Sequence, residues 1–155
     1  MIQLQHKIIH LGMISGVSIL SALFFYLKQQ QGKDGIHPNE TLQYIAMGLG
    51  FVFLVLGQIL TRKMGAEFKP KDPQSAREYI NRYIVLKLIQ WATAEGGALL
   101  NLVIFFLTGF VHNFYLGVGI VIVIALTAPS DRDFYSMFGI SENQFTAKPK
   151  KADFE

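Results

Sequence analysis

The stretch "YIVLKLIQWATAEGGALLNLVIFFLTG", residues 83–109, decides the fold. Its only charged residues are Lys87 and Glu95, and the rest is mainly apolar. A helix of about 20 apolar residues crosses the hydrocarbon core of a bilayer. The stretch therefore predicts a membrane-spanning helix with one carboxyl group near its middle.

Three further apolar blocks predict three more spans, at residues 8–27, 41–61 and 114–129. Hydrophobic residues make up 51% of the 155 and are gathered into these blocks, which is typical of a polytopic membrane protein. The first block is too long for the apolar part of a signal peptide and lacks a cleavage site, so we expect it to stay as an anchor. The sequence thus predicts an all-α fold, a bundle of four transmembrane helices formed by residues 1–139.

The segment after the fourth block carries signals of its own. In "SDRDFYSMFGI", residues 130–140, a serine precedes an aspartate by three positions and apolar residues follow at helical spacing. This pattern predicts a short capped amphipathic helix that lies at the membrane surface. Residues 140–155 have no periodicity and are expected to form a flexible cytoplasmic tail.

Lys and Arg are distributed unevenly over the connecting segments. The turn at residues 110–113 between the last two blocks has none, whereas the loop between the second and third blocks is basic. The positive-inside rule therefore predicts that both termini lie in the cytoplasm. We expect the basic residues of that loop to contact lipid head groups: Arg62, Lys63, Lys69, Lys71, Arg77 and Arg82. Nucleic acid is not an expected partner, because no soluble domain is present to carry a basic surface.

Several chemistries have no support in the sequence. Cysteine is absent, which excludes disulfides, thiolate metal sites and cysteine nucleophiles. The four histidines are far apart and lie at or beyond the ends of the blocks, so neither a metal site nor a haem is expected. No nucleotide-binding or nucleophile motif occurs. We expect no cofactor, no metal and no catalytic residue.

Small residues within the blocks mark places where helices can approach closely. They include a GxxxG pair in the first block and a cluster around residues 92–98 in the third. Small side chains allow backbone-to-backbone packing where lipid supplies no hydrophobic driving force. We expect the residues Ala92 and Gly96 to face the first span at Gly12 and Gly16, or the second span near Gly50.

Glu95 is the only acidic residue inside a predicted span. It lies thirteen residues beyond Arg82, or roughly 20 Å at the rise of an α-helix. An ionised carboxylate at that depth costs about 2.5–3.5 kcal/mol or more. We therefore expect a protonated Glu95 inside the bundle that ties the third span to a neighbour. Its expected hydrogen-bond partners are Ser15, Ser18, Ser21, Gln90 and Asn101.

The run "ATAEGGALLNLVIFFLTG", residues 92–109, resembles the carboxylate-bearing helix of the rotor-ring proteolipid, subunit c of rotary ATPases. That resemblance implies a proton or cation carrier in which Glu95 is the titrating group. The chain departs from this family in its long basic loop and in having the carboxylate in the third span. The overall arrangement also resembles small four-span proteins of bacterial inner membranes. This likeness implies a location in such a membrane but carries no activity.

Two functions from different classes follow from these observations. The first is a non-catalytic structural or accessory subunit of a larger membrane complex, with Glu95 as an interhelical clamp. The alternative is the proton or cation carrier. A proton relay needs more than one titrating group along its path, and Glu95 is the only acidic one inside a span, so the first is favoured. The expected partners are the lipid bilayer and either other membrane subunits or a second copy of this chain.

Overall fold

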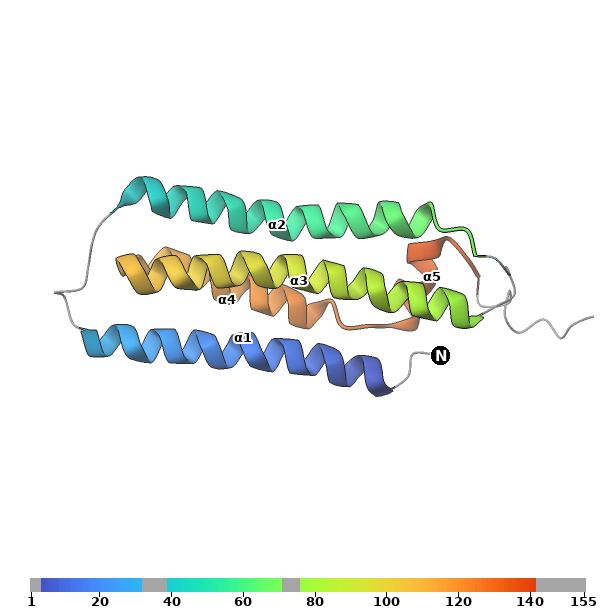
Figure 1. Ribbon diagram of the computed structural model, residues 1–155, viewed down its shortest axis with the longest axis horizontal. Helices are drawn as coiled ribbons and strands as arrows, with labels where there is room; N and C mark the ends of the chain where they lie inside the picture. The colour runs from blue at the N-terminus through green and yellow to red at the C-terminus, as the bar shows by residue number, and fades with distance from the viewer. Residues whose placement is uncertain (1–3, 32–38, 71–75, 142–155) are drawn as a thin grey trace, which may run out of the picture.

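The computed structural model describes residues 4–31, 39–70 and 76–141, and within this part of the chain it is all-helical with no strand (Figure 1). The five helices are α1 (Leu4–Gln31), α2 (Glu40–Ala66), α3 (Ala76–Thr108), α4 (Val111–Leu126) and α5 (Asp131–Phe138). The predicted all-α class is confirmed. The predicted tail falls almost wholly outside the described residues.

Three helices are long and apolar enough to cross a membrane: α1 from Lys7 onward, α2 and α3. The fourth predicted span is different, because α4 has only 16 residues, about 24 Å of helix. It reaches the length of a span only together with α5, and the two helices meet at a bend of 90°. The helix expected to run to residue 129 ends at Leu126, because Pro129 disfavours the helical conformation of the residue before it.

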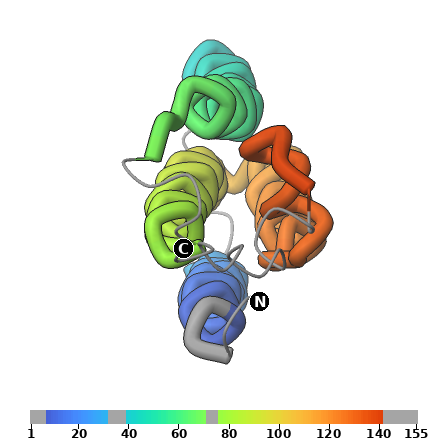
Figure 2. The backbone as a smooth tube through the Cα atoms, turned by 90° about the vertical axis from the view of Figure 1, so that its right-hand side faces the viewer, coloured from blue at the N-terminus to red at the C-terminus, as the bar shows by residue number. Residues whose placement is uncertain are grey.

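The helices lie roughly side by side, with α3 and α4 in the middle and α1 and α2 on opposite flanks (Figure 2). Half of the apolar window of α3 is buried, compared with 17% for α1 and 22% for α2, so α3 is the central helix. The main core joins α1, α3 and α4 through Val17, Trp91, Ala98, Leu102 and Ile120. The outer helix α2 packs mainly on α3, whereas α1 packs about equally on α3 and α4, and most of the remaining surface of both faces outward.

The short helix α5 has the caps that the sequence predicts. The hydroxyl of Ser130 accepts a hydrogen bond from the backbone N–H of Asp133 at 3.2 Å, and Gly139 ends the helix with φ of 64°, a conformation that favours glycine. The sequence predicted that the apolar side of α5 would face the membrane surface, but it does not do so in the structure. Phe134 and Met137 are buried in a second core with Tyr83 of α3, so this side of α5 packs on protein.

Candidate functional site

Glu95 lies on the side of α3 that turns toward α1. One turn earlier, the ring of Trp91 packs at a tilt of 42° against His10 of α1 with centroids 4.5 Å apart, and three turns later Phe106 stacks on Phe24 at 5.4 Å. Glu95 is half-buried and forms no hydrogen bond or ion pair with any residue in the described part of the chain. Among the described residues, Glu95 therefore does not form the expected clamp to a neighbouring helix.

The depth of Glu95 follows from the register of α2 against α3. A Cβ atom at Gly57 would lie 3.3 Å from the carbonyl oxygen of Gln90, and one at Gly65 would lie 3.5 Å from Leu86 Cδ1. Arg62, the first charged residue after the apolar run of α2, therefore stands level with residues 86–90 of α3. Glu95 is five to nine residues deeper, or roughly 7–13 Å. This is shallower than the depth measured from Arg82, but it would still place Glu95 inside the hydrocarbon if α3 spans a membrane.

The serines expected to bond Glu95 lie elsewhere. Ser15 and Ser18 are on the exposed surface of α1. Ser21 is buried, but its hydroxyl donates to the carbonyl oxygen of Val17 in its own helix at 2.8 Å. A serine in a helix readily bonds the carbonyl one turn back, which satisfies it without a partner from another helix.

The two amides expected near Glu95 are also engaged with other groups. Gln90 accepts a hydrogen bond from Lys87 Nζ at 3.0 Å. Asn101 is fully buried, and its amide nitrogen donates to the carbonyl oxygens of Ala46 at 3.0 Å and Gly97 at 2.9 Å. These bonds turn both amides toward α2 and the bundle interior.

Asn101 is the residue that clamps the helices together. Besides its bond to Ala46 on α2, its side-chain oxygen accepts from Asn113 Nδ2 on α4 at 2.9 Å. Asn113 is also fully buried and donates at 3.4 Å to the carbonyl oxygen of Gln43 on α2. One amide pair thus joins α2, α3 and α4, which is the role that the sequence had assigned to Glu95.

The glycines of α3 also differ from expectation in which of them contacts another helix. Gly50 of α2 packs against Gly97 of α3, where an added Cβ would lie 3.2 Å from Gly50 Cα, and a Cβ at Gly50 would overlap the amide nitrogen of Asn101. We expected Gly50 to meet Ala92 and Gly96, but its partner on α3 is Gly97. Gly96 has no atom within 4 Å of its added Cβ, and Ala92 is exposed, so the prediction for these two residues is wrong. Successive residues point about 100° apart on a helix, which turns Gly96 outward when Gly97 faces α2.

The two glycines of the GxxxG pair in α1 are also not covered by another helix. Gly12 and Gly16 are exposed, and a Cβ added at either would meet no atom within 4 Å. The contact of these two residues with the third span that we expected is not made. On α3, the exposed small residues Ala92 and Gly96 flank the half-buried Glu95, followed by Leu99 and Val103 at helical spacing. We call these five residues of α3 the Glu95 face.

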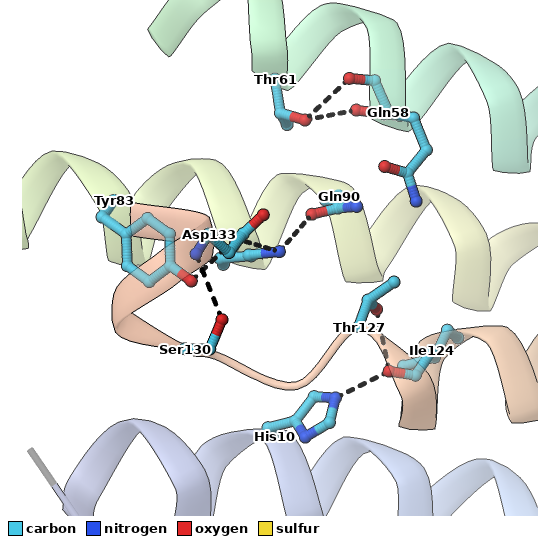
Figure 3. Close-up of polar contacts among 11 residues, drawn as sticks. His10, Gln58, Thr61, Tyr83, Gln90, Ile124, Thr127, Ser130 and Asp133 are labelled. Carbon is cyan, nitrogen blue, oxygen red and sulfur yellow. Dashed lines mark hydrogen bonds and ion pairs between the residues drawn. The ribbon is translucent and has the colours of Figure 1, made fainter. Parts of the chain in front are cut away.

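A second polar cluster lies where α5 meets α3, and the sequence did not reveal it (Figure 3). The side chain of Lys87 is 4% exposed, and its Nζ lies 2.8 Å from Asp133 Oδ2 of α5. The same oxygen accepts a hydrogen bond from the Tyr83 hydroxyl at 2.9 Å. A buried cation needs such a partner, since an isolated buried charge is very costly. The charge of Lys87 in an apolar run was the signal available, but not the identity of its partner.

His10 is a further buried polar residue that the sequence left without a role. Its Nε2 lies 2.8 Å from the carbonyl oxygen of Ile124, in the last turn of α4 (Figure 3). The hydroxyl of Thr127 donates to the same carbonyl at 2.9 Å. The last carbonyls of a helix lack partners within the helix. His10 therefore caps α4 from α1 and holds α1 against the end of α4.

The basic residues of the loop between α2 and α3 lie at one end of the bundle. Arg62, Lys63, Lys69 and Arg77 are exposed, whereas Lys71 lies outside the described residues. Arg82 is half-buried, and its guanidinium carbon lies 5.7 Å from the ring centre of Phe68. Head-group contact by these residues stays a prediction. Within the described ranges, no group of three or more His, Cys, Asp or Glu residues is placed to hold a metal ion.

Comparisons of the chain with models of protein families, with curated proteins and with solved structures find no match. The resemblances of the third span and of the whole arrangement therefore stay predictions. The function proposed below rests on the geometry of the residues themselves.

Proposed function

We propose that this chain is a non-catalytic structural or accessory subunit of a larger complex in a bacterial inner membrane. In this proposal a helix of another membrane protein docks on the Glu95 face. The observation that carries the proposal is a carboxyl group at hydrocarbon depth that has no partner among the described residues and is flanked by exposed Ala92 and Gly96.

Two physical arguments support this proposal. A carboxyl group exposed to lipid is unfavourable, and a partner helix that supplies a donor or acceptor removes that cost. Small neighbours let the partner's backbone come close enough for such a bond. A protonated Glu95 both donates and accepts hydrogen bonds. The clamp assigned to Glu95 from the sequence is then made between chains, while Asn101 serves within the chain.

The proposal includes four spans, with α4 as a short fourth span and both termini in the cytoplasm. Its support is the clustering at one end of the bundle: the N-terminal end of α1, the basic end of α2 and helix α5 lie together (Figure 1). In this arrangement α5 docks on the cytoplasmic ends of α2 and α3 rather than lying alone in the interface.

The topology predicts the outcome of reporter fusions. A reporter that is active only outside the cytoplasm should be silent when fused after Glu155 and active when inserted after Gly109, between α3 and α4. The reason is the Lys and Arg asymmetry, which keeps the basic segments inside. A reporter that fluoresces only in the cytoplasm should give the inverse pattern. Activity of the first reporter after Glu155 would overturn the four-span topology.

The docking proposal predicts that Gly96→Leu releases the partner while the bundle stays folded. A Cβ added at this position meets no atom within 4 Å among the described residues, so the bundle should accept a leucine, which would occupy the surface where the partner helix would lie. The matched control is Gly48→Leu on α2, since Gly48 is equally open. Tagged full-length protein would be purified gently from its native membrane. A partner retained by the wild type and Gly48→Leu, but lost from Gly96→Leu, is expected; equal retention by both variants would contradict the proposal.

Substitutions of Glu95 distinguish the accessory function from the carrier function. Glu95→Gln keeps a side chain that donates and accepts hydrogen bonds, so the partner should be retained, whereas Glu95→Leu should lose it. In a carrier the glutamine variant would abolish ion movement, because the titrating proton is gone. Partner retention and proton flux in reconstituted vesicles would be measured on the same preparations. Loss of flux in Glu95→Gln would favour the carrier.

A further inference from the structure

The early end of α4 leaves a polar cavity near the basic end of α2. The chain leaves α4 at Leu126, turns through residues 127–130 and enters α5 at 90°. Two adjoining hollows of about 220 Å³ and 200 Å³ lie between α2, α3 and this bend. Both are lined by Gln58, Arg62, Gln90 and Asp133, so we treat them as one space, the α2–α5 cavity.

The walls of the α2–α5 cavity carry both signs of charge. The Arg62 side chain is exposed and makes no ion pair with any described residue. Asp133 Oδ2 is bound by Lys87 and Tyr83, which leaves Oδ1 for another donor. The side-chain amides of Gln58 and Gln90 point toward the same space (Figure 3). A ligand would therefore meet one guanidinium, one carboxylate oxygen and two amides, while Lys87, which also lines the cavity, is already paired with Asp133.

The cavity also lies at the level of lipid head groups. Arg62 is the first charged residue after the apolar run of α2, so it marks the boundary between hydrocarbon and water. Beside the cavity, the surface of the two helices that faces deeper into the membrane is apolar. Leu126 lines the cavity and is 80% exposed, Ile122 lies one turn deeper on α4, and Val55 lies one turn deeper than Gln58 on α2.

We propose that the α2–α5 cavity binds the head group of a membrane phospholipid that carries a primary ammonium, as in phosphatidylethanolamine. The phosphodiester accepts from Arg62 and from the amides, and the ammonium donates to Asp133 Oδ1. An acyl chain then follows the exposed apolar strip of Ile122 and Leu126. A head group with only anionic charge fits less well, because it brings the same phosphodiester without an ammonium to pair with the Asp133 carboxylate, and Lys87 is already paired with Asp133. A quaternary choline fits less well, because it has no N–H to donate.

Native mass spectrometry of the full chain tests this binding with defined lipids: phosphatidylethanolamine, phosphatidylcholine and phosphatidylglycerol of identical acyl chains. The wild type should retain the ethanolamine lipid over both others. Arg62→Gln removes the charge-assisted bond to the phosphodiester, and retention should fall by about tenfold. Lys63→Gln is the matched control, since Lys63 is exposed, lies at the same level and does not line the cavity. It should retain the lipid as the wild type does.

A second variant tests the shape of the cavity, and a competing anion tests whether the site binds a lipid or free phosphate. Ala66→Phe would place a ring at the exposed rim of the cavity and should also lower retention without touching a charge. Inorganic phosphate at millimolar concentration should not displace the lipid; displacement would show a site for a free anion and overturn the proposal. Preference for the glycerol or choline head group, or equal retention by Arg62→Gln and Lys63→Gln, would overturn it as well. This inference does not depend on the docking partner of the Glu95 face.

Discussion

Replacing Gly50 by leucine should separate α2 from α3, whereas the same change at Gly96 should leave the stability of the bundle unaltered. Gly50 is buried where the backbones of α2 and α3 touch, and its Cβ position is occupied by the amide of Asn101. A leucine there forces the helices apart and breaks the bond from Asn101 to the carbonyl oxygen of Ala46. We expect a loss of about 3 kcal/mol, at the upper end of what overpacking costs.

The measurement is thermal or denaturant unfolding of the full chain in one detergent, followed by the near-ultraviolet signal of Trp91, the only tryptophan. Trp91 is 3% exposed in the core of α1, α3 and α4, so its environment reports on packing. Gly96→Leu serves as the matched control, since it adds the same side chain to the same apolar environment. Equal midpoints for the two variants would show that α2 and α3 do not meet through Gly50.

The contrast between Gly96 and Gly97 shows why the sequence predicted the helices better than their faces. A soluble helix reveals its inner side by an alternation of apolar and polar residues. A helix in lipid is apolar all round, so that signal is missing and only small residues mark an interface. Gly96 and Gly97 are adjacent and chemically identical, yet only Gly97 touches α2. The existence of α1, α2 and α3 follows from the apolar runs; the rotation of α3 does not.

Polar contacts between residues close in the sequence were predictable, whereas polar contacts between different helices were not. The cap of α5 by Ser130 was predictable, because both partners lie within four residues of the chain. Asn101 and Asn113 come from different helices, and their bond depends on how α3 and α4 pack. Glu95 attracted the functional prediction because it is charged, whereas the neutral Asn101 is the residue that is fully buried. Glu95, which is the most unfavourable residue to place in a membrane, therefore has no hydrogen-bond partner among the described residues, whereas Asn101 has several.

Because Lys87 and Asp133 form a buried ion pair, we expect a single substitution to lower the free energy of unfolding strongly. The double substitution should restore most of it. Asp133→Leu leaves the Lys87 ammonium buried without its carboxylate, with the Gln90 side-chain oxygen and the ring of Tyr83, 5.8 Å away, as its neutral partners. Removing one member of a buried ion pair costs about 3–5 kcal/mol. We expect the lower end of this range, because Asp133 is 36% exposed and water can reach the site. Lys87→Met with Asp133→Leu removes both charges, and most of the lost stability should return.

The four proteins of this cycle would be unfolded under identical conditions, and the coupling free energy taken from their differences. The matched control is Glu67→Leu, which removes the carboxylate from the exposed pair of Lys63 and Glu67, 4.0 Å apart, where an effect below about 1 kcal/mol is expected. Recovery in the double variant would mean that the pair serves to neutralise Lys87 where α5 docks. If the double variant were as unstable as Asp133→Leu alone, the hydrogen bond from Tyr83 to Asp133, rather than charge neutralisation, would hold α5 in place, because that bond is lost in both variants.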